Sequence, residues 1–332
     1  MKQINIGLLG LGNIGTGSYK TLEMNGGHIR DVVGLDLIVT RILEKDVDRK
    51  RDITVSRGIF TQDPDEIWND PDIDVVVELL GGIEPATSFM IAAMNRGKHV
   101  VTANKAAVAA NYEALTDAAA RNRVMFRFEA AVGGGIPILN ALTTALSANE
   151  YEEIMGILNG TTNYILTKMS EEDLPYADAL REAQENGFAE ADPTADVEGE
   201  DVANKLSILM SLVFGKRVRP EDIPTEGITK ITKADIEGAK ADGCVIKLLA
   251  SAFKRGDEIT CFIQPTMLNR SHPLASVGNE FNAIFVKGNA VDDLMFYGKG
   301  AGPLPTGSAV LGDVIEIGRA IAKGAAFDLN ET

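Results

Sequence analysis

The sequence predicts an α/β protein in which a helix-flanked parallel sheet is joined to a second domain of α+β class. Over the first third of the 332 residues, short β-rich runs alternate with helical runs. Strands and helices that alternate in this way form right-handed βαβ units. Farther along, strand-like runs follow one another without helices, which is typical of an antiparallel or mixed sheet. Three consecutive glycines, 133–135, separate the two patterns.

The elements of the first domain follow from apolar periodicity and helix propensity. We predict strands over 4–9, 37–43, 73–78, 99–102 and 124–128, and helices over 14–24, 86–96 and 105–121. The last of these helices is rich in alanine, the strongest helix former.

The second domain should begin with a helix at Ile138. We then predict a strand over 153–158, helices over 163–169, 176–186 and 201–214, and strands over 245–254, 258–267, 282–286 and 294–297. A glycine-rich segment, 298–307, precedes a last apolar helix over 309–322. We therefore expect residues 1–134 and 303–332 to form a dinucleotide-binding domain, to which the last helix returns. Residues 135–302 should form a substrate-binding and dimerisation domain.

The composition excludes several classes of protein. Hydrophobic residues make up 45% of the chain, enough for a sizeable core. The net charge of −16 argues against a general surface for nucleic acid or anionic membranes. Two cysteines cannot build a disulfide scaffold, and no apolar run approaches the roughly 20 residues that cross a bilayer. A cytoplasmic enzyme is the expectation.

A glycine motif follows the first predicted strand and opens the first predicted helix. Its sequence, Gly10-Leu-Gly-Asn-Ile-Gly15, matches G-x-G-x-x-G in the context that the motif requires. Gly10 allows a tight turn, Gly12 lets the backbone approach a pyrophosphate, and Gly15 permits close helix–strand packing. The helix N-terminus offers N–H groups to the phosphates. The motif predicts a dinucleotide site in a Rossmann-type domain.

The segment after the second strand bears on the choice of cofactor. Glu44 or Asp46 would bind the ribose 2′-hydroxyl of NAD, whereas Lys45 or the cluster Arg49-Lys50-Arg51 would pair with the 2′-phosphate of NADP. The basic residues tilt the prediction towards NADP and leave NAD open.

The most distinctive segment contains six carboxylates between Glu190 and Asp201, followed by Lys205. The spacing does not fit a calcium-binding EF-hand loop, and the lack of a nearby histidine argues against a zinc site. Asp201 and Lys205 lie four residues apart on a predicted helix and share a face. On spacing alone, an exposed ion pair worth about 0.3–0.5 kcal/mol is the simpler interpretation. The neighbouring glycines, proline and apolar helix instead indicate the mouth of a cleft, where a lysine acts as general acid or base.

These motifs together resemble those of homoserine dehydrogenases. The matching segments are GLGNIG, GKHVVTANKAAVA, EAAVGGGIPI, ILNGTTNYILTKM, GFAEADPTADVEGEDVANKL and GKGAGPLPTGSAVLGDVIE, in this order over nearly all of the chain. The acidic segment is the most specific of them. The resemblance implies NAD(P)-dependent oxidation of L-homoserine to L-aspartate 4-semialdehyde, and the reverse reduction, in threonine and methionine biosynthesis.

The resemblance also implies roles for individual residues. Lys205 falls at the family's acid/base lysine, and Lys105 at a lysine that contacts cofactor and substrate, with a second proton-transfer role open to it. Glu190 and Asp201 fall at homoserine-binding carboxylates, with Asp196 as a further candidate. Leu11, Asn13, Ile14, Gly187 and Gly302 join Gly10, Gly12, Gly15 and Lys45 as cofactor contacts. A monovalent cation, sodium or potassium, is implied at Glu129, Val132, Gly134 and Ile136.

The family implies a homodimer formed through the sheet of the second domain. Many members carry an additional C-terminal ACT domain, and this chain is expected to be either a short form without it or a shortened piece of a longer chain. Two alternatives stay open. A related dehydrogenase of another amino acid or semialdehyde would share the glycine loop, and a nucleotide-binding sensor would bind the cofactor without turnover.

Overall fold

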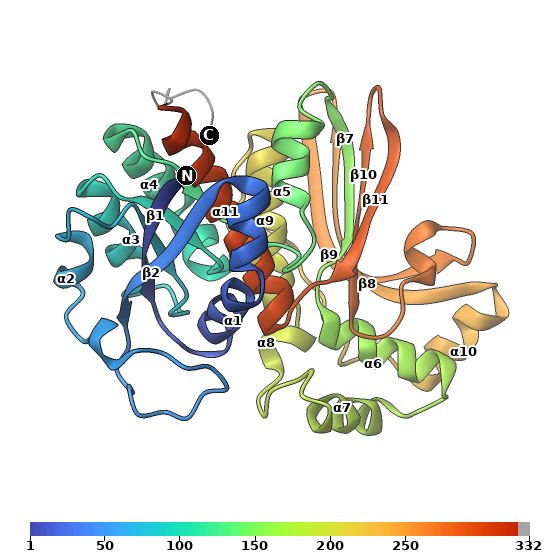
Figure 1. Ribbon diagram of the computed structural model, residues 1–332. Coiled ribbons are helices and arrows are strands. Elements are labelled where there is room, and N and C mark those ends of the chain that lie inside the picture. The colour runs from blue at the N-terminus through green and yellow to red at the C-terminus, as the bar shows by residue number, and fades with distance from the viewer. Residues whose placement is uncertain (325–332) are drawn as a thin grey trace. The chain divides into compact units, whose positions relative to one another are not determined.

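The computed structural model describes residues 1–324 (Figure 1), and the chain divides into two compact units. The first unit contains Met1–Gly135 and residues 302–324, and the second contains Ile136–Ala301. Residues 325–332 of the predicted dinucleotide-binding domain lie outside the described part of the chain. Each boundary lies one residue from the position that the sequence predicts. No helix within residues 1–324 combines the length and the apolar character that a membrane crossing requires.

The first unit is built on a six-stranded parallel sheet in the order β3-β2-β1-β4-β5-β6. Its strands are β1 (Lys2–Leu9), β2 (Leu35–Leu43), β3 (Phe60–Thr61), β4 (Val75–Glu78), β5 (His99–Thr102) and β6 (Phe126–Arg127). Its helices are α1 (Asn13–His28), α2 (Asp65–Trp68), α3 (Ala86–Asn95), α4 (Lys105–Asn122) and α11 (Pro303–Lys323). The strand order reverses between β1 and β4. In such sheets the ligand crevice lies at the carboxyl ends of the strands next to this reversal.

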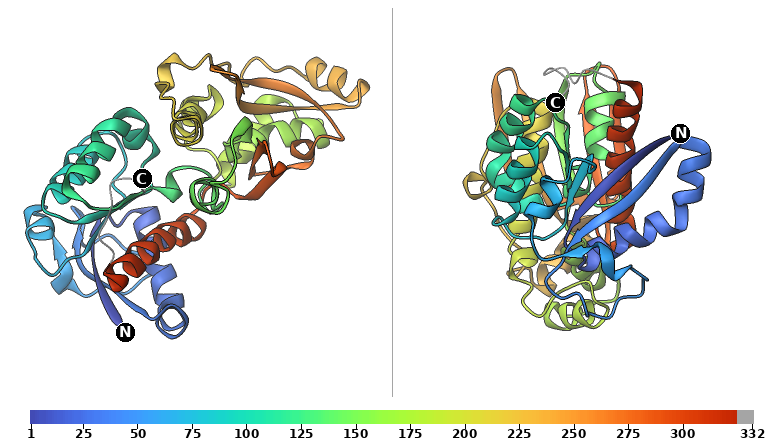
Figure 2. Two further views of the ribbon diagram at one scale, coloured as in Figure 1. Left: turned by 90° about the horizontal axis from the view of Figure 1, so that it is seen from above. Right: turned by 60° about the vertical axis from the view of Figure 1, so that its left-hand side comes forward.

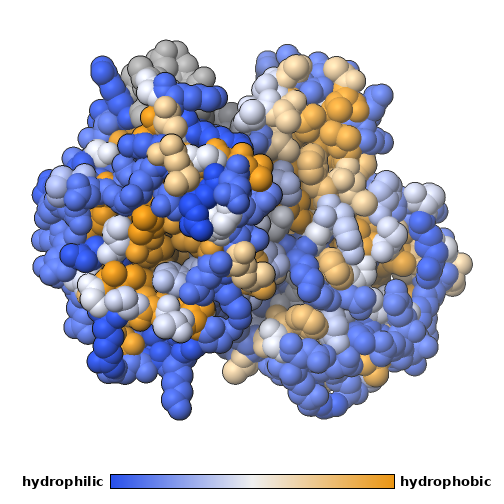
Figure 3. Space-filling model, in the orientation of Figure 1, coloured by the Kyte–Doolittle hydropathy of each residue, from blue (hydrophilic) through white to orange (hydrophobic). Residues whose placement is uncertain are grey.

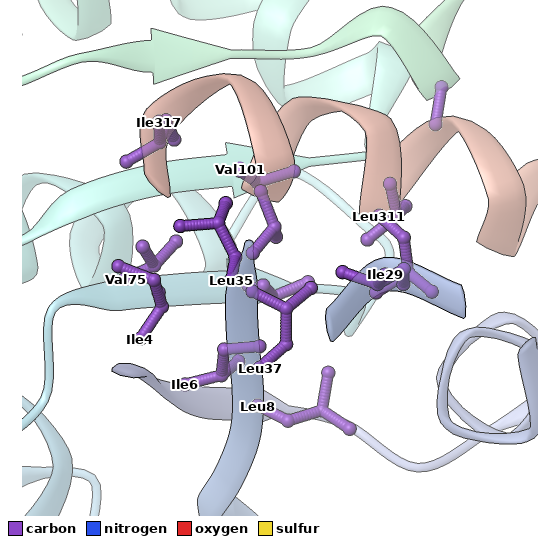
Figure 4. Packing of buried hydrophobic residues seen from close by; sticks show 14 of the residues in the cluster. Ile4, Ile6, Leu8, Ile29, Leu35, Leu37, Val75, Val101, Leu311 and Ile317 are labelled. Atoms are coloured by element: carbon purple, nitrogen blue, oxygen red, sulfur yellow. The ribbon is translucent and has the colours of Figure 1, made fainter. Parts of the chain in front are cut away.

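The helices of the first unit cover both faces of its sheet, with α11 on one face and α3 and α4 on the other (Figure 2). On the α11 face, Leu311 and Ile317 belong to one buried cluster with Ile4 and Val101 of the strands, and Leu311 lies beside Ile29 (Figure 4). A Cβ atom at Gly307 of α11 would lie 2.8 Å from the backbone of Ser18, so α1 and α11 approach closely. The last helix therefore belongs to the first unit, as the sequence predicts.

The start of α11 differs from the sequence prediction. The helix begins at Pro303, within the glycine-rich segment, and not at Ala309. Proline suits the first turn of a helix because its missing N–H would have no partner there. Gly302 caps the helix with φ +116°, a conformation that side chains disfavour.

The second unit holds a five-stranded antiparallel sheet in the order β11-β10-β7-β8-β9. Its strands are β7 (Tyr151–Ile157), β8 (Cys244–Arg255), β9 (Glu258–Asn269), β10 (Phe281–Gly288) and β11 (Asp292–Lys299). Its helices are α5 (Ile138–Asn140), α6 (Gly160–Glu171), α7 (Tyr176–Glu185), α8 (Thr194–Val197), α9 (Glu200–Phe214) and α10 (Lys233–Ala241). Helices α6, α9 and α10 pack against β8. The predicted α/β and α+β classes are confirmed.

Candidate active site

The glycine motif forms a tight turn between β1 and α1. Gly10 has φ +93°, and a Cβ atom there would lie 3.0 Å from the carbonyl oxygen of Leu79. A Cβ atom at Gly15 would lie 2.2 Å from the carbonyl oxygen of Gly10, which no side chain tolerates. Around Gly12, by contrast, a Cβ atom would meet nothing within 4 Å. Two glycines are therefore required by packing, and the third faces open space that a pyrophosphate can approach.

The N-terminus of α1 suits an anion. Within the described chain, no side chain caps it at Gly12, and its first turn carries no acidic residue. The first N–H groups and the positive end of the helix dipole therefore remain for phosphate oxygens. Asn13 is exposed and Ile14 is half-buried in this turn. These observations fit the dinucleotide that the motif predicts.

Glu44 and Arg51 lie against the same loop from the end of β2. The Glu44 carboxylate accepts hydrogen bonds from the backbone N–H groups of Leu11 (3.0 Å) and Asp46 (3.0 Å). Arg51 pairs with the Glu44 carboxylate at 3.0 Å and donates through Nε to the carbonyl oxygen of Leu11 at 2.9 Å. Burial alone would raise the pKa of Glu44, but these N–H donors and Arg51 lower it below its usual value. Lys45 is exposed beside them.

A buried network follows β4 and β5 at the same edge of the sheet. The Glu78 carboxylate accepts from Thr102 Oγ1 (2.6 Å) and from the N–H of Leu80 (2.7 Å). Asn104 donates to the carbonyl oxygen of Gly82 and caps α4 through the N–H of Ala107. Burial raises the pKa of Glu78. The network fixes the start of α4, where Lys105 lies half-buried.

Glu78 was missed in the sequence analysis. The sequence does contain a pattern that indicates this residue. A carboxylate ends an otherwise apolar strand, at the edge where parallel sheets bind ligands.

In the second unit, Lys205 lies at the centre of a buried polar cluster. Its Nζ donates to Asp201 Oδ2 at 2.7 Å and to the carbonyl oxygen of Leu158 at 2.6 Å. The side chains of Lys205 and Asp201 are 10% and 9% exposed. The exposed ion pair that spacing alone favours is therefore wrong. Helix α9 buries one face through its apolar residues, and Asp201 and Lys205 lie on the buried part of the helix.

Asn159 connects two carboxylates of the acidic segment. Its Oδ1 caps α6 by accepting from the N–H of Thr162 at 2.8 Å. Its Nδ2 donates to Asp196 Oδ1 at 2.7 Å and to Asp201 Oδ2 at 3.0 Å. Because one amide group caps a helix and holds two acids, α6, α8 and α9 meet at this point. Asp196, Asp201 and Lys205 are thus brought together.

The electrostatics of the cluster are set by burial. Burial raises the pKa of Asp196, and the neighbouring Asp201 raises it further. The Asn159 amide, Lys205 and Thr161 oppose this shift in part. Two carboxylates that share one amide and one ammonium give the cluster a strong field, which is typical of sites that handle a proton or a charged substrate.

Glu190 and Gly187 lie on the exposed stretch after α7. Thr161 Oγ1 donates to the carbonyl oxygen of Phe188 at 2.5 Å, which ties this stretch to the cluster. Gly187 has φ +75° with open space around it. Glu190 is exposed, and its carbonyl oxygen accepts from the side chain of Gln184.

The residues implied for a cation lie around the three glycines. Glu129, Val132 and Gly134 are buried in the first unit, and Ile136 is the first residue of the second. The N–H of Glu129 donates to Asp313 of α11 at 2.9 Å. Residues 1–324 contain no group of three His, Cys, Asp or Glu side chains that could hold a metal. Backbone carbonyl oxygens would have to supply most of the ligands.

The two units therefore offer complementary chemistry. The first unit offers backbone N–H groups and a carboxylate at the edge of its sheet, which suit a dinucleotide. The second offers a buried ammonium among carboxylates, which suits a polar substrate that exchanges a proton.

Comparison with known proteins gives matches over both units. A family model described as homoserine dehydrogenase matches residues 137–315, and one described as homoserine dehydrogenase, NAD binding domain, matches residues 10–129. The homoserine dehydrogenase of Bacillus subtilis is 44% identical over 317 residues, which cover 96% of this chain and 73% of the relative.

Two solved structures extend the comparison. A homoserine dehydrogenase from Thiobacillus denitrificans has a TM-score of 0.92 at 42% identity, and the match covers 97% of this chain and 75% of that one. A hyperthermophilic archaeal homoserine dehydrogenase mutant in complex with NADPH has a TM-score of 0.80 at 25% identity, with coverage of 95% and 97%.

Proposed function

This chain belongs to the homoserine dehydrogenase family, and from that premise we propose how its site residues share the reaction. The enzyme oxidises L-homoserine to L-aspartate 4-semialdehyde with NAD or NADP and catalyses the reverse reduction, a step of threonine and methionine biosynthesis. The observation that carries the proposed roles is the buried Lys205–Asp201 pair at 2.7 Å within a carboxylate cluster.

The first unit holds the cofactor in this proposal. The open space at Gly12 and the N–H groups of α1 receive the pyrophosphate, with Leu11, Asn13 and Ile14 in the same turn. Gly10 and Gly15 give the turn its shape, and Gly187, Gly302 and Lys45 are further contacts. When bound, the nicotinamide accepts or supplies the hydride.

Lys205 moves the proton. In the reductive direction its ammonium stabilises the developing alkoxide and then protonates it. In oxidation the neutral amine form of Lys205 receives the hydroxyl proton as hydride leaves the carbon, which restores the ammonium. Asp201 and the carbonyl oxygen of Leu158 fix the ammonium in place, so little reorganisation is needed during the reaction.

The carboxylates bind the amino acid. Homoserine carries an ammonium group that requires a negative partner. We assign Glu190 to that group because its side chain is exposed while its segment is tied to the cluster through Phe188. Asp196 and Asp201 complete the negative environment. Lys105, at the start of α4, contacts cofactor and substrate and is the second candidate for proton transfer.

Glu129 and the backbone carbonyl groups of Val132, Gly134 and Ile136 bind a sodium or potassium ion. Hydrophobic residues and glycine offer only backbone oxygen, a ligand that such hard cations accept.

The second unit also mediates a homodimer. Its edge strand β11 carries Met295 and Tyr297 on one face of the sheet, and they are 39% and 54% exposed. Figure 3 shows hydrophobic residues gathered over the strands of this sheet. Exposed apolar patches of this kind mark protein interfaces. Sedimentation equilibrium should give twice the mass of the chain, and a monomer at micromolar concentration would remove this part of the proposal.

The function is tested by adding homoserine and each nicotinamide cofactor to the purified protein and recording the absorbance of the reduced cofactor. We expect turnover with homoserine and little with other amino alcohols. Turnover only with another amino alcohol would favour the related dehydrogenase. Cofactor binding without any turnover would favour the sensor.

A further inference from the structure

The end of β2 carries two residues with opposite consequences for cofactor choice. In Rossmann-type domains, a carboxylate near this position binds the ribose 2′-hydroxyl of NAD, whereas a nearby arginine accommodates the 2′-phosphate of NADP. This chain has both, because Glu44 directly follows β2 and Arg51 folds back onto it. Their hydrogen bonds decide between the two outcomes.

The guanidinium group of Arg51 is hydrogen-bonded to other groups of the protein. Its side chain is 7% exposed. Nε donates to the carbonyl oxygen of Leu11 at 2.9 Å and Nη1 to that of Arg49 at 3.0 Å. Nη2 donates to the carbonyl oxygen of Asp46 at 3.0 Å and pairs with Glu44 at 3.0 Å. An arginine has about five N–H donors, so these bonds leave little of Arg51 for a phosphate.

The carboxylate of Glu44 is fixed at the glycine loop. The N–H of Leu11, within the motif, donates to one of its oxygens, and the N–H of Asp46 donates to the other. Burial would raise the pKa of Glu44, but its N–H donors and Arg51 outweigh that effect, so the group is ionised at neutral pH like an exposed glutamate. A 2′-phosphate placed here would meet a carboxylate oxygen, and the paired Arg51 has its donors engaged elsewhere, while a ribose hydroxyl would meet a hydrogen-bond acceptor.

We propose that Glu44 makes NAD(H) the preferred cofactor of this chain and that Arg51 holds the glycine loop in shape instead of binding a 2′-phosphate. This inference rests on the proposed function, since it names the cofactor of that same site. The preferred cofactor is therefore NAD(H), and not the NADP that the basic residues of the sequence favour. Specificity arises here from repulsion of the wrong cofactor as well as attraction of the right one.

The test is direct titration of NADH and NADPH, followed by cofactor fluorescence, with the wild type and four single variants. In the wild type, NADH should bind at least about tenfold more tightly than NADPH. Glu44→Gln should shift this ratio towards NADPH by about 10-fold to 100-fold, because hydrogen bonds to charged groups have this magnitude. Asp48→Asn is the matched control. It removes one charge from the same loop, at a side chain that is 77% exposed, and should leave the ratio unchanged.

The other two variants separate the roles of the basic residues. Arg51→Gln should weaken both cofactors to a similar degree, because it loosens the turn that either cofactor needs. Lys45→Ala removes a proposed cofactor contact, so it should weaken NADH and NADPH by a similar factor and leave their ratio near that of the wild type. A selective loss of NADPH binding in either variant would overturn the inference.

Tighter binding of NADPH than NADH by the wild type would also overturn it, as would a Glu44→Gln variant with an unchanged ratio. Failure of the proposed function has a different signature. In that case homoserine gives no turnover with either cofactor, whatever the binding ratio of NADH to NADPH.

Discussion

The glycine loop of the first unit and the Lys205 cluster of the second are built on different principles. The loop makes its site from backbone, so its requirements are steric: a Cβ atom at Gly15 would lie 2.2 Å from a carbonyl oxygen. The cluster makes its site from side chains of three segments that Asn159 joins. The loop should therefore be sensitive to added volume and the cluster to changed charge.

Added volume in the loop should give the largest effect. Gly15→Val places atoms on the carbonyl group of Gly10, and we expect the free energy of unfolding to fall by about 3 kcal/mol or more. Denaturant unfolding of the first unit measures this change. NADH titration should show an accompanying loss of affinity.

Gly12→Ala is the matched control in the same motif. It should leave the stability nearly unchanged because its Cβ atom enters open space, yet it should weaken cofactor binding because that space receives the pyrophosphate. Equal losses of stability in the two variants would contradict the steric distinction.

Changed charge in the cluster should give the next effect. Asp201→Asn keeps the shape of the side chain but removes the charge that faces Lys205. We expect kcat/KM for homoserine to fall by about 10-fold to 100-fold, with cofactor affinity unchanged. Glu200→Gln, an exposed neighbour on the same helix, is the control and should behave like the wild type. A similar loss in both variants would mean that only the overall charge matters.

A second buried lysine, in the strand β8, allows a comparison with Lys205 of the cluster. Lys247 of β8 donates to Asn163 Oδ1 at 2.9 Å and to the carbonyl oxygen of Val277 at 2.5 Å. Burial lowers its pKa to about 8, with Glu171 opposing. The unfolded state therefore binds more protons between the two pKa values, so this residue's contribution to stability improves as pH rises.

From about pH 8 to 9.5, the wild type should gain about 1 to 2 kcal/mol relative to Lys247→Met. Urea unfolding at both pH values measures this difference. Lys287→Met, at a side chain that is 46% exposed, is the control and should show no such trend. A flat difference for Lys247→Met would show that the lysine is charged when folded across this range.

The glycine loop could be predicted from sequence because its determinants are local. Gly10, Gly12 and Gly15 lie within six residues, directly after an apolar strand, and each has one steric reason to be glycine. The alternation of strands and helices in the first unit could likewise be predicted from the sequence. Helix α10 was missed although a capping box from Thr232 to Asp235 marks its start.

The cluster could be predicted only in part. Its residues were named through the family resemblance, but spacing alone favoured an exposed Asp201–Lys205 pair. The pair is buried with the apolar face of α9, and it accepts a hydrogen bond from Asn159, which lies 42 residues before Asp201 in the sequence. Likewise, the sequence offers Arg51 as one of several basic residues that could pair with a 2′-phosphate, whereas its guanidinium donates to the carbonyl oxygens of Leu11, Arg49 and Asp46. Long-range contacts of this kind leave no periodic signal in the chain.

The central claim is that Lys205 moves the proton while a separate set of residues binds the cofactor. Lys205→Met tests it most directly when NADH binding and homoserine oxidation are measured on the same preparation. We predict an NADH dissociation constant within about twofold of the wild type and a turnover at least about 100-fold lower. Turnover close to that of the wild type, with homoserine oxidised as before, would contradict the account.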